Sequence, residues 1–412
     1  MERISLLEIK VDKNIVRFVY SVSENLRKYF TSDAFFVEYE QDVSDVPISI
    51  LTIPFVCCMA GLSWLSGAML FVDEVDYTFY ESFKQLKVAY SELHDTSLKG
   101  VFVPSNLVNN TVEQSQDSLL LFGGGIDCHT SLLRHKDKIT GIINIYGWLE
   151  SETQNSVVDV FDKKTTLDVG KRFGIYSYHV RSNFASQFNL NEIDRNLCRE
   201  LGTSYWYGFL HSMAFLSIST PIAWTNKMPN LIIASSFTKN RSDVHCGSFF
   251  TTDSEYRFGT NGNTLHDAFE LNRQKKVQLI VQHQKLLRKP YYIQACSFND
   301  HNCCECEKCF RTVIELVAEN SDPRDFGFII NDSLLDHWKS IIYRDVALWG
   351  VNKEKYYYHI ARKRMLENYD NLQDKEFVDW FLNFDFGKAK KEGLRRYYRQ
   401  NFFSILKRKL HL

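Results

Sequence analysis

The sequence predicts an α/β protein with a parallel sheet flanked by helices, a small N-terminal α/β domain and a helical C-terminal extension. Between residues 118 and 240, the uninterrupted apolar segments SLLLF, TGIINIYG and NLIIASS alternate with helix-like segments. Apolar strands of this kind are typical of parallel sheets that are covered by helices on both faces. The length of 412 residues is also too great for one ordinary core, so two or three packed units are expected.

Composition narrows the class of protein. Hydrophobic residues make up 44% of the chain and charged residues 24%, as in soluble globular proteins. The net charge of −1 provides no overall attraction to nucleic acid, so no nucleic-acid partner is expected. Five of the ten cysteines fall between Cys296 and Cys309, unlike the spread-out cysteines of a secreted disulfide scaffold. With no secretory pattern at the start, this placement favours a reducing, cytoplasmic compartment.

The N-terminal domain is expected to cover residues 1–110. The segments ISLLEIKV, NIVRFVYSV and AFFVEYE alternate as strands do, and Tyr77–Tyr90 resembles a helix. The stretch Val46–Val72 has no charged residue and is long enough to cross a bilayer. Its two prolines and two glycines favour a buried strand, short helix and second strand instead, at Ile48–Ile53, Phe55–Leu65 and Ala68–Val72. The polar segment 104–117 is the expected linker.

A second domain, residues 111–325, is expected to hold the parallel sheet, with helices near Val157–Phe173 and Ile193–Leu216. No strand is predicted in residues 326–412, which form the C-terminal extension. Helical, aromatic segments are expected there at Ser333–Ala347, Lys353–Asn368 and Glu376–Asn383. From Lys388 to the end, the sequence has nine basic residues and one acidic residue, interleaved with aromatic ones. A basic helix of this kind suits an anionic membrane surface, although a docked final helix with a solvated basic face explains it as well.

A glycine loop, Gly123-Gly124-Gly125, follows the apolar strand SLLLF and precedes a helix that begins near Asp127. Glycines allow backbone N–H groups to approach an anion, and a helix N-terminus supplies further donors and a positive dipole end. The loop matches neither a Walker motif nor a dinucleotide fingerprint. It is therefore either a phosphate cradle or a tight turn that Asp127 caps.

Four cysteines, Cys296, Cys303, Cys306 and Cys309, are spaced to bind one Zn²⁺, because short C-x-x-C turns present neighbouring sulfurs to one point. Cys304 is treated as a bystander, and His301 is an alternative ligand. An iron–sulfur cluster and a group of buried thiols are the other interpretations.

The loop and the cysteines together resemble the PP-loop ATP pyrophosphatases, of the adenine nucleotide alpha hydrolase-like fold. That family carries Ser-Gly-Gly-x-Asp-Ser, where this chain has Gly123-Gly124-Gly125-Ile126-Asp127-Cys128. Its cyano-deazaguanine synthase branch carries a late Cys-Gly-x-Cys-x-x-Cys. A related group encoded among bacterial surface-polysaccharide genes carries Asn-Cys-Gly-x-Cys-x-Lys-Cys-x-Arg-Thr, similar to the segment from Asn302 to Thr312 here.

The second group resembles this chain at three further places: His266-Asp267 with Arg273 and Lys276, Leu210-His211-Ser212, and Gly247-Ser248. The resemblance implies that Gly123, Gly124, Gly125, Asp127 and Cys128 bind ATP. It implies catalytic or substrate contacts for Asp127, His266 and Asp267, and a Mg²⁺ ion near Asp127. Cys128 is interpreted as a replacement for serine; a nucleophilic thiol with a lowered pKa is the alternative.

The resemblance thus implies an ATP-dependent enzyme that adenylates a carboxylate or carbonyl oxygen, releases pyrophosphate and forms a C–N bond. A bacterial surface-polysaccharide or modified-base pathway would suit this chemistry. The chain departs from the family at both serines of the loop, which removes two side-chain donors to phosphate. The alternative is therefore an impaired nucleotide-binding or scaffold protein that acts with a partner. The expected ligands are structural Zn²⁺, ATP, Mg²⁺ and a carboxylate or other small-molecule substrate, and a homodimer remains open.

Overall fold

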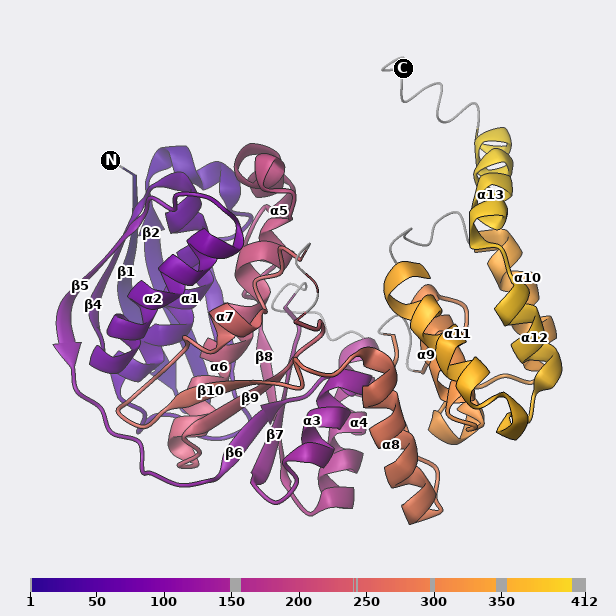
Figure 1. Cartoon of the computed structure of the whole chain (residues 1–412). Coiled ribbons are helices and arrows are strands. Elements are labelled where there is room, and N and C mark those ends of the chain that lie inside the picture. The colour runs from indigo at the N-terminus through magenta and orange to yellow at the C-terminus, as the bar shows by residue number, and fades with distance from the viewer. Residues whose placement is uncertain are drawn as a thin grey trace. The chain divides into compact units, whose positions relative to one another are not determined.

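The computed structural model describes residues 2–148, 157–239, 241, 244–296, 301–345 and 354–401. The chain divides into two compact units, Met1–Leu271 and Asn272–Leu412 (Figure 1). This division differs from the predicted boundaries near residues 110 and 325. The difference arises because the first 110 residues share one sheet with the strands that follow, and because the cysteine segment belongs to the second unit.

The first unit is built on a ten-stranded sheet of order β10-β9-β6-β7-β8-β3-β2-β1-β4-β5. The strands are β1 (Arg3–Asp12), β2 (Ile15–Val22), β3 (Phe35–Glu38), β4 (Met69–Asp76), β5 (Val101–Val108), β6 (Ser118–Leu121), β7 (Ile139–Tyr146), β8 (Tyr176–Ser182), β9 (Asn230–Ala234) and β10 (Asn263–Asp267). The five strands from β6 to β10 run parallel to one another. The chain leaves β6 in one direction, toward β7 and β8, and later returns to β9 on the other side of β6. This reversal of strand order is the switch point at which doubly wound sheets bind ligands.

The two halves of the sheet meet where β3 pairs antiparallel with β8, through Val37 opposite Ser182. Beyond β3, the hairpin of β2 and β1 continues the sheet, and β4 and β5 add parallel strands at its edge. The strand β5 occupies the beginning of the predicted linker. Pro104 is tolerated there because β5 is the edge strand, where a missing N–H leaves no neighbour unpaired.

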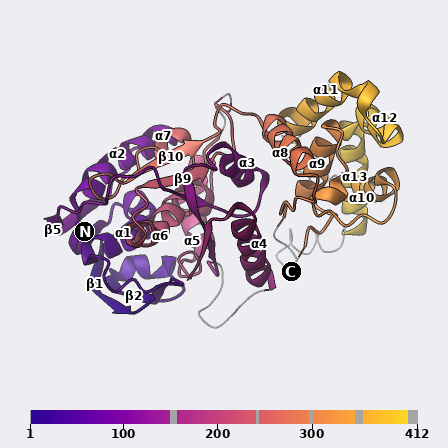
Figure 2. The same ribbon diagram turned by 90° about the horizontal axis from the view of Figure 1, so that it is seen from below.

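Helices cover both faces of the sheet, as expected of a parallel α/β architecture (Figure 2). Leu119 and Ile143 belong to one core, whereas their chain neighbours Leu120 and Ile142 belong to another, as the alternation of side chains along a strand requires. The helices of this unit are α1 (Ile48–Ser66), α2 (Tyr77–Leu93), α3 (Ile126–Arg134), α4 (Val157–Phe173), α5 (Leu190–Ile193), α6 (His211–Thr225) and α7 (Phe250–Asp253). Shorter 3₁₀ or π-helical segments are η1 (Glu24–Tyr29), η2 (Asp194–Cys198), η3 (Arg199–Leu201) and η4 (Trp206–Leu210).

The charge-free stretch Val46–Val72 forms one helix, α1, followed by the start of β4. The predicted helix Phe55–Leu65 and the predicted strand Ala68–Val72 are confirmed, whereas the predicted strand Ile48–Ile53 is wrong, because these residues belong to the beginning of α1. Pro54 lies inside this helix, and Gly67 ends it in the left-handed conformation at φ 77°. An internal proline costs about 3 kcal/mol. Burial offsets this cost, because 89% of the most apolar window of α1 is buried. Among the described residues, α1 alone is long and apolar enough to cross a membrane, and its burial confirms the expected core segment.

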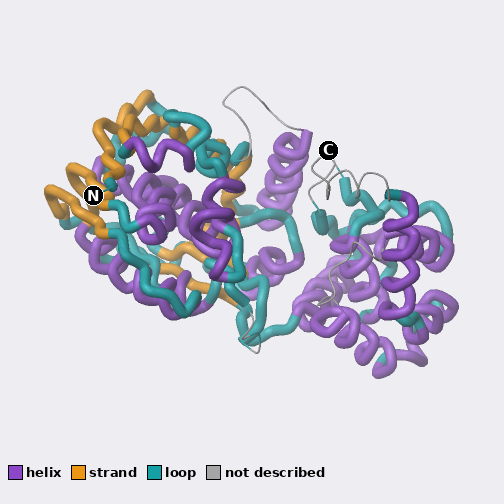
Figure 3. Tube along the Cα trace, turned by 90° about the horizontal axis from the view of Figure 1, so that it is seen from above, coloured by secondary structure: helices purple, strands orange, loops and turns teal. Residues whose placement is uncertain are grey.

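The second unit is helical in the part of it that the structure describes (Figure 3). Its helices are α8 (Arg273–Leu287), α9 (Glu307–Ala318), α10 (Leu334–Asp345), α11 (His359–Glu367), α12 (Lys375–Asn383) and α13 (Phe386–Gln400), with short segments η5 (Pro323–Phe326), η7 (Glu354–Tyr358) and η8 (Tyr369–Asn371). The ring of Phe310 on α9 contacts those of Trp338, Tyr358 and Phe381 at centroid distances of 5.1, 5.7 and 5.9 Å. The aromatic helices that were predicted for residues 326–412 thus pack against α9 and form a helical core with it.

We expect Gly61→Ala to destabilise the first unit, because α1 approaches η4 closely at this glycine. An added Cβ would lie 2.8 Å from Cβ of Phe209 and 2.9 Å from the ring of Tyr205. Overpacking of this kind costs about 1–3 kcal/mol. Urea unfolding should show the loss, with Gly387→Ala on α13 as the control, since its Cβ would meet only the Asp385 carboxylate at 3.3 Å. Equal stability changes for the two variants would contradict the close packing.

Candidate functional site

The glycine loop connects the carboxyl end of β6 to the first turn of α3, at the switch point of the sheet. Gly124 has φ +73°, a conformation that residues other than glycine rarely adopt. Gly123 is exposed, and a Cβ added there would meet nothing within 4 Å. The loop therefore needs glycine for its turn at Gly124, and at Gly123 it leaves the backbone open to an approaching ligand.

Backbone groups of the three glycines converge on the sulfur of Cys128. Burial raises the pKa of the Cys128 thiol to about 12, and hydrogen bonds from the backbone of Gly123, Gly125 and Gly124 only partly oppose this effect. The thiol also donates to the carbonyl oxygen of Gly125 over 3.2 Å. The alternative of a nucleophilic Cys128 with a lowered pKa is thus wrong, and the sulfur marks the point at which the loop amides meet.

A cavity of about 330 Å³ opens beside the loop, within the first unit. Gly123, Gly125, Asp127 and Cys128 line one side of it, and residues of β6, β7 and β9 together with Phe215 of α6 line the rest. Its other wall residues are mostly apolar and include Leu121, Ile143, Ile145, Phe215 and Ile233. Such a cavity, with a backbone-lined polar end and an apolar wall, suits a ligand that joins an anionic group to a flat ring.

Asn144 of β7 also lines this cavity, although no pattern in the sequence marks this residue. Its Nδ2 donates to the carbonyl oxygen of Phe122 over 3.1 Å. Its Oδ1 is buried and has no hydrogen-bond donor among the described residues. A buried acceptor without a partner is costly, so Asn144 is a candidate to accept a hydrogen bond from a ligand.

Asp267, a predicted catalytic residue, holds α3 against the end of β10. Its carboxylate accepts hydrogen bonds from Ser131 Oγ at 2.7 Å and His135 Nε2 at 2.9 Å, and it pairs with Arg134 at 3.2 Å. Burial raises the pKa of Asp267, but the hydrogen bonds from His135 and Ser131 and the nearby positive charges outweigh burial and lower it. These contacts assign Asp267 to positioning the helix that follows the glycine loop.

His266, the second predicted catalytic residue, lies within β10 rather than at the predicted loop–helix junction. Its Nδ1 is 2.8 Å from the carboxylate of Asp253, a buried residue that the sequence did not mark. The same carboxylate accepts hydrogen bonds from Ser212 and from Ser248, the latter at 2.8 Å. Ser212, Ser248 and His266 come from the three separate segments that resemble the polysaccharide-cluster group. All three side chains contact the buried carboxylate of Asp253.

The three predicted catalytic residues have different surroundings. Asp127 lines the cavity beside the glycine loop, His266 contacts Asp253, and Asp267 contacts α3. Neither His266 nor Asp267 is among the residues that line the cavity. Alternation along β10 explains the separation, because consecutive residues of a strand point to opposite faces of the sheet.

The second unit brings together the four predicted metal ligands, Cys296, Cys303, Cys306 and Cys309. Their sulfur atoms all lie within 4.8 Å of one another. The Cys303 and Cys309 sulfurs are 3.8 Å apart, and those of Cys309 and Cys296 are 3.6 Å apart. Four sulfurs at about 2.3 Å from a tetrahedral Zn²⁺ would be about 3.8 Å from each other. The donor set and its spacing therefore fit zinc.

The backbone around the cluster supports thiolate ligands. The amide of Cys303 donates to the Cys296 sulfur, and the amide of Glu305 donates to the Cys303 sulfur, both over 3.4 Å. Cys304 lies outside the four-sulfur group, and its thiol faces the carbonyl oxygen of Asn302. Cys304 has φ +54°, where glycine is the favoured residue. His301, the other alternative ligand, is also outside the group.

Asn302 fixes the turn that carries these cysteines. Its side chain is fully buried, donates to the carbonyl oxygens of Ile293 and Gly327, and accepts from the amide of Ala295. After the turn, α9 begins with Cys306 as its N-cap residue and places Cys309 in its first turn. The metal ligands are thus attached to the helix that forms the centre of this unit.

We expect the purified chain to contain one zinc ion and Cys309→Ser to lose it, because a neutral hydroxyl replaces a thiolate in a four-ligand set. Metal that binds only the folded state stabilises it by about 4 kcal/mol at a thousand times its Kd, so the variant should melt at a lower temperature. Elemental analysis and calorimetry measure both effects. Cys304→Ser is the matched control and should keep its zinc. Loss of zinc in this control, or its retention in Cys309→Ser, would refute the assignment of ligands.

No protein-family model matches the sequence, and no curated protein matches it. The likeness to the PP-loop enzymes therefore depends on the residues of this chain alone, and the part of the fold that is shown is a mostly parallel α/β sheet flanked by helices.

Proposed function

We propose that this protein binds ATP at the glycine loop and uses it to adenylate an oxygen of a small-molecule substrate. The observation that carries the proposal is the glycine loop, whose backbone groups converge at the switch point of the sheet beside a largely apolar cavity. The order of the five parallel strands is also compatible with the adenine nucleotide alpha hydrolase-like fold that the resemblance implies.

In this proposal the amides of Gly123, Gly124 and Gly125 hold the phosphates, and the N-terminus of α3 adds its positive end. The apolar wall at Ile143 and Phe215 receives the adenine ring, and Asn144 accepts a hydrogen bond from the nucleotide. Asp127 would bind a Mg²⁺ ion, whose chemistry there is to neutralise phosphate charge. Asp267 and its partners keep α3 in place while the nucleotide binds.

The reaction that fits these parts is attack of a carboxylate or carbonyl oxygen on the α-phosphorus of ATP, with release of pyrophosphate. A nitrogen nucleophile would then displace AMP and form the C–N bond. A surface-polysaccharide or modified-base pathway would use such a product. The zinc would be structural, since four protein ligands leave no position for a metal-bound water.

A second function is favoured by the same loop. Gly123 and Cys128 stand where the resembling enzymes have serine, and each lost hydrogen bond to a charged phosphate is worth about 1.5–3 kcal/mol. A protein that binds ATP without turning it over, and that acts as a scaffold with a partner, would retain the backbone cradle but not these donors.

We expect Gly124→Ala to weaken ATP binding by about tenfold or more, because Gly124 has φ +73° and a residue with a Cβ would have to leave this conformation and shift the loop amides. Calorimetric titration of ATP with Mg²⁺ measures the affinity, and Gly387→Ala on α13 should bind as the parent protein does. Pyrophosphate release in the presence of candidate carboxylates separates the two functions. An absence of ATP binding by the parent protein would contradict both.

The basic helix α13 supports a further part of the proposal, contact with an anionic membrane surface. Its exposed side carries Lys388, Lys391, Arg395, Arg396 and Arg399, and Tyr398 beside them is 56% exposed. None of these five cations has an ion-pair partner among the described residues. Each such cation near an anionic bilayer contributes about 1 kcal/mol of binding.

We expect the triple charge reversal Lys388→Glu, Lys391→Glu and Arg395→Glu to reduce binding to phosphatidylserine vesicles by about a hundredfold or more at low salt. Sedimentation with vesicles measures it, and phosphatidylcholine vesicles should bind neither protein. Reversal of Lys136, Lys138 and Lys171, which are exposed on the first unit, changes the net charge equally and is the control. A parent protein that stays in the supernatant would end this part of the proposal.

A further inference from the structure

Two buried polar atoms of the parallel sheet, Asn144 Oδ1 on β7 and His179 Nε2 on β8, have no hydrogen-bond partner among the described residues. Asn144 is 5% exposed and His179 is 1% exposed. The two residues are directly opposite each other in the parallel register of β7 and β8. Neighbouring strands lie about 4.8 Å apart, and opposite residues direct their side chains to the same face of the sheet. One small group can therefore bond to both atoms.

The printed partners of these side chains make both free atoms acceptors. Asn144 Nδ2 donates to the carbonyl oxygen of Phe122 over 3.1 Å, so the atom left over is Oδ1. His179 Nδ1 is 3.0 Å from the carboxylate of Glu40. Burial raises the pKa of Glu40, but hydrogen bonds from Lys163 and His179 outweigh burial and lower it, so the carboxylate is ionised and accepts the Nδ1 proton. Nε2 of the neutral imidazole then carries a lone pair and no hydrogen.

Contacts on the far side of His179 hold its ring in place. Lys163 Nζ is 2.5 Å from one oxygen of Glu40, and His179 Nδ1 is bonded to the other. Glu40 follows β3, which pairs with β8. A carboxylate that binds one ring nitrogen fixes both the tautomer and the direction of the other nitrogen. Glu40 and Lys163 thus act on a ligand only through His179, as positioning residues.

The pair of acceptors is connected to the cavity beside the glycine loop through Asn144. Asn144 and its partner Phe122 both line this cavity, and Phe122 is followed directly by Gly123. His179 lies one strand further along the sheet, next to Asn144. A ligand in the cavity that reaches the Asn144 side chain therefore meets two neighbouring acceptors.

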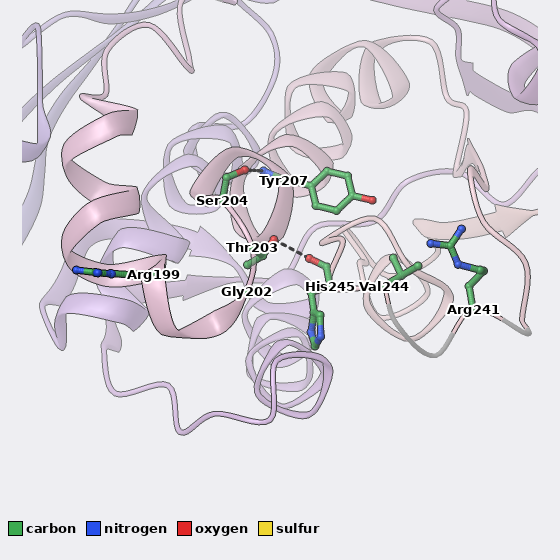
Figure 4. A pocket seen from close by; sticks show the side chains of 8 residues that line it. All are labelled: Arg199, Gly202, Thr203, Ser204, Tyr207, Arg241, Val244 and His245. Atoms are coloured by element: carbon green, nitrogen blue, oxygen red, sulfur yellow. Dashed lines mark hydrogen bonds between the residues drawn. The ribbon is translucent and has the colours of Figure 1, made fainter. Parts of the chain in front are cut away.

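The polar residues of another cavity in the first unit, of about 500 Å³, do not converge in this way (Figure 4). Its two arginines, Arg199 and Arg241, lie on opposite sides of the view. The register of β7 and β8, in contrast, places Asn144 and His179 side by side. The recognition element that the fold defines best is therefore the pair of acceptors.

Two neighbouring acceptors suit a group with two N–H donors, such as an amino group on an aromatic ring. The 6-amino group of adenine has this form, and the apolar wall at Ile143 and Phe215 suits the faces of its ring. A purine with an oxygen at position 6 presents a third acceptor there. Both buried atoms would then stay unpaired, which is unfavourable.

We propose that Asn144 Oδ1 and His179 Nε2 together accept hydrogen bonds from the 6-amino group of adenine. The inference rests on the proposed binding of ATP beside the glycine loop and adds the residues that select the base. The site then prefers adenine nucleotides to 6-oxopurine nucleotides that carry the same phosphates.

The test compares ATP with inosine triphosphate, which has an oxygen in place of the 6-amino group and a proton on N1. Calorimetric titration of the full chain with each nucleotide and Mg²⁺ measures the two affinities. ATP should bind more tightly by about tenfold or more. Equal affinities would overturn the inference and leave the proposed function standing, whereas an absence of ATP binding would overturn both.

Two variants of His179 locate the preference. His179→Phe keeps a planar ring but removes the acceptor, so the ratio of the two affinities should fall to about threefold or less, mainly because ATP binds more weakly. His179→Gln retains an amide donor for Glu40 and an oxygen acceptor beside Asn144, so it should keep most of the ratio. A full ratio in His179→Phe would contradict the assignment.

Two controls separate base selection from other effects. Gly124→Ala should weaken both nucleotides by the same factor, since their phosphates are identical. Ser177→Ala removes a hydrogen bond of 3.1 Å from β8 to the carbonyl oxygen of Thr166 on α4, two residues before His179, and should leave the ratio unchanged. If Ser177→Ala lowers the ratio as much as His179→Phe does, packing beneath α4 sets the preference and the inference is wrong.

Discussion

The packing of α1 against α6 is the contact on which the first unit depends. Both helices are apolar on nearly every side, so each must be covered on all sides to remove that surface from water. α1 lies on β1 and β4, and α6 lies on β6 and β9, so their contact joins helices from the two ends of the sheet. Because α6 also carries Phe215, the same packing fixes one wall of the cavity beside the glycine loop.

The sequence was sufficient for the class of fold and for the local geometry of two motifs. Apolar strands predicted the parallel part of the sheet, and the three glycines do lie between a strand and a helix. The cysteine spacing predicted which four sulfurs converge, because a short turn leaves few alternatives. It failed at the beginning of α1, where Pro54 indicated a boundary between a strand and a helix. Local propensity is a weak prior, and tertiary burial on all sides of α1 outweighed it.

The predicted site was less accurate than the predicted motifs, for a geometric reason. His266 and Asp267 are adjacent in the sequence, which suggested one shared role, but a strand directs them to opposite faces and to different partners. Asp253 and Asn144 were missed because neither belongs to a spacing pattern, and their importance comes only from what the fold places around them.

The neutral thiol at Cys128 has a consequence for how an anion would meet the loop. With a pKa near 12, about one thiol in 10⁵ is ionised at neutral pH, so the sulfur places no negative charge where the loop amides converge. A thiolate at this position would repel phosphate strongly. A thiol at this position differs from a serine hydroxyl in size and donor strength, but like the hydroxyl it is neutral at pH 7. The electrostatic field at the loop is therefore set by the glycine amides and the N-terminus of α3.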